Sequence, residues 1–190
     1  GRLLGNSDIN SSQIQSFYVI YDGVVQRFNR STDLPSGVSL PITRAMLNAD
    51  TNLLKGIGSA PKSLMGYYID LSLSASNVAE RVNVAPVSNF GTVSFAANLP
   101  NGDACNPSGT NRVFSLDIGT GASRVVNATG LAQPYYTNGG LVVDLSYLNV
   151  NGNIRLLAGT DQSTVNSVPL VPTIVQAIRQ INWREVPTAD

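Results

Sequence analysis

The chain consists of short runs of β-forming residues that are separated by turn signals, and this spacing limits its fold more than any other feature. Runs rich in Val, Ile, Tyr and Phe recur along the sequence, and Gly, Asn, Asp or Pro interrupts them. About ten short strands, with turn signals roughly every 8–15 residues, are typical of an all-β sandwich, barrel or propeller. No shift in composition marks a domain boundary, so residues 1–190 are expected to form a single all-β region.

Alternating residues and turn signals define the individual strands. Residues 13–30 alternate around Asp22-Gly23, a dipeptide that is typical of a tight hairpin. Residues 43–54 predict a loop with a turn or two. Asp117 and Gly119 interrupt the run at 111–126, which predicts a second hairpin that returns through Val125 and Val126. The other expected strands are 65–73, 80–86, 91–100, 139–148, 153–160 and 179–186. The last is preferred over a helix, whose apolar face would consist of Ile174, Ile178 and Ile181.

Composition excludes several classes of function. The 12 basic residues equal the 12 acidic ones, whereas a nucleic-acid-binding protein would carry a basic excess. The chain has no His, which removes His-dependent general base and Ser-His-Asp chemistry, so we expect no enzymatic activity. No apolar run approaches the ~20 residues of a transmembrane helix. Only 13% of the residues are charged, and Asn, Ser, Thr and Gly are abundant, as in many exported β-proteins.

Two polar loops contain candidate functional residues. Cys105 lies in the loop 101–111, where no His could activate its thiol. It is either a free thiol or the partner of a cysteine outside this sequence, and we slightly favour the disulfide. Residues 48–52 begin like a calcium loop but lack its central Gly and final Glu, so a plain polar loop is the better interpretation.

Other side chains allow both a structural and a functional interpretation. Glu80 and Arg81 are more readily explained as a structural or surface pair than as catalytic groups. Several aromatic residues could line a carbohydrate-binding face, although such residues more often pack within sheets. These are Tyr67, Tyr68, Tyr135, Tyr136 and Trp183.

Six segments, in order, resemble the PilC/PilY family of type IV pilus biogenesis factors and tip adhesins. Residues 1–22 resemble the family's Gly-Arg-x-Leu-Gly-x-x-Asp and Gln-x-Gln-Ser-x-Tyr-x-Ile-x-Asp motifs. Residues 66–71 resemble Gly-Trp-Tyr-x-Asp-Leu, with Tyr67 in place of Trp. The other similar segments are "ERV" at 80–82, "NLPNGDAC" at 98–105, "SGTNRVFSLDIGTG" at 108–121 and "NWREV" at 182–186.

The resemblance implies a β-propeller fold, namely the C-terminal blades of that family. Within it, Leu-Asp-x-x-Thr-Gly is a recurring hairpin in which Asp117 and Thr120 bond to the backbone and Gly121 supplies a positive φ. We therefore interpret these residues as structural. Trp183 is expected to be buried on a closing strand. The family's calcium loop has no counterpart here, so no cofactor is expected.

The implied function is that of an extracellular pilus-tip or cell-surface protein that promotes pilus biogenesis, twitching motility and surface adhesion. Its implied partners are minor pilins, the rest of the propeller, and a host or surface receptor. One alternative is an extracellular carbohydrate- or surface-binding β-domain. A quinone-dependent propeller enzyme is a third, suggested only by the Leu-Asp-x-x-Thr-Gly turn.

The chain length predicts that the ring is incomplete. Blades of about 40–50 residues allow at most about four in 190 residues, whereas the family's propeller is larger. We therefore expect a partial propeller that is completed by another segment or chain, or that collapses into a compact stack of sheets.

Overall fold

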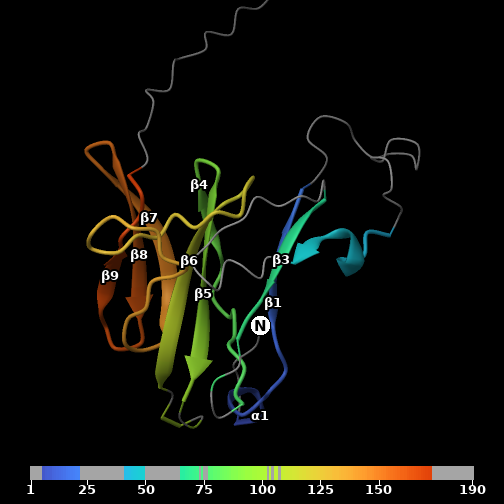
Figure 1. The fold of residues 1–190 in the computed structure, drawn as a ribbon. Helices are drawn as coiled ribbons and strands as arrows, with labels where there is room; N and C mark the ends of the chain where they lie inside the picture. Colours follow the sequence, from blue (N-terminus) through green and yellow to red (C-terminus); the bar gives the residue numbers. More distant parts are fainter. Residues whose placement is uncertain are drawn as a thin grey trace, which may run out of the picture.

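The computed structural model describes residues 6–21, 41–49, 65–72, 74, 77–101, 103, 105–106 and 108–172. Three small sheets form successive layers, which confirms the all-β fold class (Figure 1). The helical elements of the described residues are one short helix, α1 (Asn6–Ile9), and one 3-10 turn, η2 (Arg44–Met46). None of them is long and apolar enough to cross a membrane.

The first sheet has the strand order β1-β3-β2. Strand β1 (Ser16–Ile20) pairs antiparallel with β3 (Gly66–Asp70), and the two-residue β2 (Asn48–Ala49) pairs parallel with β3. Alternation along β1 and β3 turns Phe17, Val19, Tyr67 and Ile69 toward the core. Of the loop with a turn or two expected at residues 43–54, the structure describes 43–49, which contain η2 and β2; the short strand was not predicted.

The middle sheet is a meander of β4 (Val87–Asn89), β5 (Thr92–Pro100) and β6 (Gly109–Asp117). Strands β5 and β6 pair antiparallel over their full nine residues. Isolated bridges lengthen both edges: Arg81 pairs with Asn98 on β5, and Ser123, Tyr136 and Gly139 pair with β6. The middle sheet therefore has a broken fourth strand position beside β6.

The third sheet is a second meander, of β7 (Val142–Val150), β8 (Asn153–Thr160) and β9 (Val165–Val168). The expected tight turn joins β7 to β8, with positive φ values of 52° at Asn151 and 82° at Gly152. Strand β9 was not predicted, because its residues "VNSV" give only a short and weak alternating pattern.

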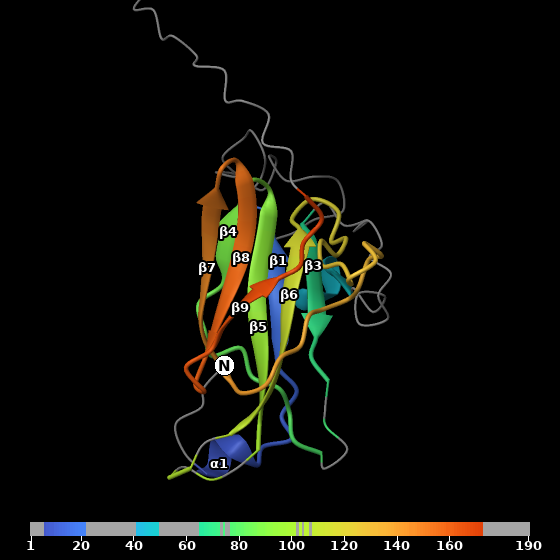
Figure 2. The same ribbon diagram turned by 90° about the vertical axis from the view of Figure 1, so that its left-hand side faces the viewer.

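The middle sheet is buried on both faces. Figure 2 looks onto the third sheet, behind which the middle sheet lies. On one face, Phe95 stacks between Phe17 and Phe114, with ring centroids 3.8 and 4.8 Å away. On the other, Ala96 and Val113 pack against residues of β7, β8 and β9. Each outer sheet thus has one face in the core and one turned away from the middle sheet.

One strand prediction was wrong, and a second was right only in part. Residues 80–86 contain only the bridge at Arg81, and β4 begins after Pro86. The segment after the Asp117 turn leaves β6 once Ser123 has paired, and Val125 then bridges to Leu170 instead. Asp22-Gly23, Trp183 and the strand expected at 179–186 lie outside the described residues.

Candidate functional site

The turn after β6 is held by the side chain of Asp117. Its Oδ1 accepts hydrogen bonds from the backbone N–H and the hydroxyl of Thr120, both at 2.9 Å. The backbone N–H of Gly121 donates to the carbonyl of Asp117 at 2.8 Å, and Gly121 has a φ of 68°. The Asp117 side chain is therefore engaged in shaping the turn.

The first sheet is bonded to this same turn. The Tyr21 hydroxyl donates to the carbonyls of Ile118 and Gly119 at 3.0 and 3.1 Å, and the Tyr67 hydroxyl donates to that of Asp117 at 3.3 Å. Burial, and then the negative charge of Asp117, raise the pKa of Tyr21 above its ordinary value. The turn thus fastens one layer of the structure to the next.

Cys105 lies exposed in the loop between β5 and β6, as a free thiol. The Oδ1 of Asp103 accepts hydrogen bonds from the backbone N–H groups of Cys105 and Asn106, both at 2.8 Å. An exposed thiol is accessible to a second cysteine, so the disulfide to a cysteine outside this sequence stays a prediction.

Glu80 and Arg81 are both buried, but they do not pair with each other. Glu80 forms a bidentate ion pair with Arg112. Arg112 Nε donates to Glu80 Oε1 at 2.5 Å, and Arg112 Nη2 donates to Glu80 Oε2. Arg81 instead donates to the backbone carbonyls of Asp8 and Ser11. The structure therefore favours the structural interpretation over a surface pair.

The outward face of the first sheet carries a cluster around Arg44. Its guanidinium donates to both carboxylate oxygens of Asp70, at 2.7 and 2.6 Å, and to the hydroxyls of Ser16 and Tyr18. It also lies 3.8 Å from the ring centroid of Tyr68. Burial alone would raise the pKa of Asp70, but the hydrogen bonds from Ser16 and Arg44 lower it overall.

The proposed aromatic face is not assembled. Tyr67 is fully buried, Tyr68 is covered by Arg44, and Tyr135 packs against Phe114 and Arg112. Tyr136 packs against the buried residues that lie between the middle and third sheets. These four Tyr residues thus share no platform for a sugar ring, and Trp183 lies outside the described residues.

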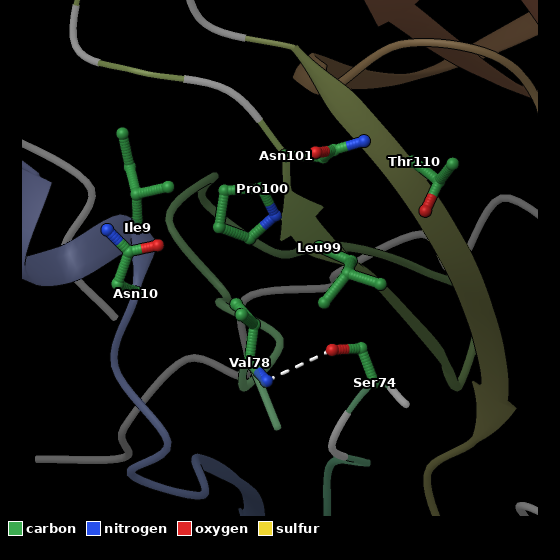
Figure 3. Close-up of a pocket in the computed structure, with 8 residues that line it drawn as sticks. All are labelled: Ile9, Asn10, Ser74, Val78, Leu99, Pro100, Asn101 and Thr110. Carbon is green, nitrogen blue, oxygen red and sulfur yellow. Dashed lines mark hydrogen bonds between the residues drawn. The ribbon is translucent and has the colours of Figure 1, made fainter. Parts of the chain in front are cut away.

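A pocket of about 480 Å³ opens at the end of the sheets near α1 (Figure 3). Ile9 and Asn10 of the α1 end contribute one side, and Leu99, Pro100 and Asn101 come from the end of β5. Thr110 of β6 and the loop residues Ser74 and Val78 complete the lining. The volume lies within the ~300–1,000 Å³ range of small-molecule sites.

Among the residues that the structure describes, none of those lining the pocket has a charged side chain. The side-chain amide of Asn101 and the hydroxyl of Thr110 make no hydrogen bond within the described part of the chain. The Ser74 hydroxyl accepts one from the backbone N–H of Val78 at 3.0 Å. Sequence reasoning missed this site because its residues come from four separate segments, which only the fold brings together.

The described residues contain no group of three His, Cys, Asp or Glu side chains that could hold a metal ion. Comparisons with known proteins gave no match to any family model, curated protein or solved structure.

Proposed function

We propose that the chain is an exported, non-enzymatic component of the type IV pilus, resembling the C-terminal propeller region of the PilC/PilY family. In this proposal the sheets are consecutive propeller blades. The protein promotes pilus assembly and twitching motility, and it acts at the pilus tip, where it contacts minor pilins and a surface receptor.

The repeated order of the strands carries this proposal. Strands β4-β5-β6 and then β7-β8-β9 form two antiparallel meanders in chain order, and β7 packs against β4 and β5. Consecutive four-stranded sheets that pack face to face are the building principle of a propeller. The broken strand position beside β6, at Ser123, Tyr136 and Gly139, supplies the fourth member of the middle sheet.

The places of the family-like segments add support. The segment at 66–71 forms β3, and 108–121 forms β6 and the Asp117 turn. Arg81, from the segment at 80–82, pairs with Asn98, from the segment at 98–105. These four segments thus lie beside one another in space as well as in order along the chain.

The experiment is a pair of substitutions in the full-length protein in its native host. Phe95→Asp places a charge in the fully buried stack of rings, whereas Leu131→Asp changes a side chain that is 65% exposed. We expect Phe95→Asp to abolish surface pili and twitching and Leu131→Asp to leave both unchanged. Normal piliation with Phe95→Asp, in cells where the protein is no longer detectable, would contradict the proposal.

The neutral pocket favours carbohydrate binding as a second candidate function. Uncharged amide and hydroxyl groups beside apolar side chains suit a neutral sugar, whose hydroxyls need partners and whose C–H groups need apolar contact. Binding of the purified chain to a glycan array tests this. Asn101→Ala and Thr110→Val should each remove the binding, and Thr137→Val, an exposed position outside the pocket, should not. Equal binding by all three variants would contradict this candidate.

A further inference from the structure

The outer face of the third sheet combines exposed apolar side chains with two unpaired charges. We define this face by Asp144, Ser146, Leu148, Arg155, Leu157 and Val165, which the strand register places on the side away from the core. Leu148 is 47% exposed and Val165 is 69% exposed. Neither Asp144 nor Arg155 forms an ion pair with any described residue.

The composition of this face indicates that its occupant is another β-sheet. The face of the middle sheet that the third sheet already covers presents Ser94, Ala96, Val113 and Ser115, a mixture of hydroxyl and aliphatic side chains. The outer face of the third sheet repeats that mixture, with Ser146 beside Leu157. Sheets that pack face to face commonly bury such residues at a spacing of about 10 Å.

The register gives this face a self-complementary arrangement of charge. Gly159 lies between Asp144 on β7 and Val165 on β9, so the sheet surface has a gap there. Arg155 lies two residues to one side of Leu157, and Gly159 lies two residues to the other. Consider a two-fold axis that lies between the two facing sheets and runs perpendicular to the strands, over Leu157. This axis places Arg155 of each copy over Gly159 of the other copy. Arg155 then lies next to the carboxylate of Asp144 in that other copy.

We propose that the outer face of the third sheet binds a second copy of this chain, two-fold symmetrically, through Leu157 and two Arg155–Asp144 ion pairs. The first sheet's outward face is a poorer match, because Arg44 and Asp70 there already satisfy each other. This proposal does not depend on the pilus function.

The expected dimer is weak. Strands of nine, eight and four residues give a face of roughly 330 Å² per copy, about two-fifths of the area that stable complexes bury on each partner. We expect a dissociation constant on the order of 10–100 µM. Because the charges lie at an accessible interface, the dissociation constant should rise with salt concentration.

Sedimentation equilibrium of the 190-residue chain, from about 5 µM to about 1 mM, tests the proposal. Asp144→Arg and Arg155→Asp should each weaken the dimer by at least about tenfold, because like charges then face each other. The double variant restores opposite charges, so its dissociation constant should return to within about threefold of the parent. Leu131→Asp, on an exposed loop elsewhere, is the control and should have no effect.

Gly159→Ala gives an independent test. An added Cβ would meet no atom closer than 3.9 Å, so the fold should be unaffected, yet the methyl group occupies the gap that receives Arg155. We expect weaker dimerisation with an unchanged unfolding midpoint. A chain that is monomeric over the whole concentration range, or a double variant as weak as the single ones, would overturn the proposal.

Discussion

At the scale of single residues, short-range hydrogen bonds of polar side chains fix the turns. Asp117 shows why such a turn is predictable from sequence: an Asp followed by Thr at the third position has its acceptor and donors within local reach. The charged partners of Arg112 and Arg44 were not predictable, because each lies 26 to 32 residues away along the chain.

Removing the Asp117 carboxylate should loosen the turn. Asp117→Ala deletes the acceptor of two hydrogen bonds, and we expect it to lower the free energy of unfolding by about 1–2 kcal/mol in urea titrations. Thr120→Val removes only the hydroxyl bond, so it should cost less. An Asp117→Ala chain as stable as the parent would show that the backbone bonds alone hold the turn.

The Arg44 cluster should make stability sensitive to acid. The pKa of Asp70 is lowered in the folded chain, so the ion pair contributes stability above the ordinary carboxyl value of 3.8. That contribution is lost as the pH falls through the lower, folded pKa. It should be small because both side chains are nearly half exposed. The urea midpoint of Asp70→Asn should fall less than that of the parent between pH 5 and pH 2, and parallel curves would exclude the effect.

At the scale of elements, the buried ion pair ties the segment after β3 to β6. Glu80 also accepts a hydrogen bond from the backbone of Ser72, at 3.1 Å, so one carboxylate joins three segments. The Arg112 guanidinium in turn lies 4.8 Å from the ring centroid of Tyr135.

Breaking this pair on one side should be costly. Glu80→Ala leaves the largely buried Arg112 without a counter-charge, and we expect a loss of about 3–5 kcal/mol in the free energy of unfolding. The double variant Glu80→Leu/Arg112→Leu removes both charges, so it should be more stable than Glu80→Leu or Arg112→Leu alone. A double-mutant cycle measures the difference, and additive losses would show that the two side chains are not coupled.

Alternation in the sequence was sufficient to predict most strands but not how they are covered. Alternation within the strand predicted at 91–100 sets Phe95 and Ala97 on one face, yet Ser94 and Ala96 on the other face are equally buried. From the sequence alone, a small hydroxyl side chain in a strand is expected to face solvent. Here Ser94 bonds to Ser115 and to the Tyr147 hydroxyl across the layers, which only the tertiary structure reveals.

At the scale of the whole molecule, the layers follow one another in the order of the chain (Figure 1). Their number and stacking were not predictable, because they depend on which faces cover each other. The pocket beside α1 was unpredictable for the same reason: it exists only where the ends of several segments meet.

Trp183 provides a direct test of how the chain closes. It is the single Trp of the sequence, so fluorescence excited at wavelengths that the seven Tyr residues do not absorb reports on it alone. We expect a blue-shifted emission that acrylamide quenches slowly, and a cost of about 3–5 kcal/mol for Trp183→Ala. A solvent-exposed emission spectrum with an unchanged melting temperature would contradict both the closing strand and the propeller proposal.

The two-sided burial of the middle sheet has a consequence in time as well as in energy. Either outer sheet can detach while β5 and β6 remain covered on their other face. By contrast, β5 and β6 cannot separate until the packed residues on both faces of the middle sheet have come apart. Backbone amides of Phe95 and Phe114 should therefore exchange with deuterium only through global unfolding, and those of β1 and β9 through smaller openings. Exchange rates measured residue by residue would rank the described strands by how rarely they open. The β5–β6 pair should exchange most slowly among them.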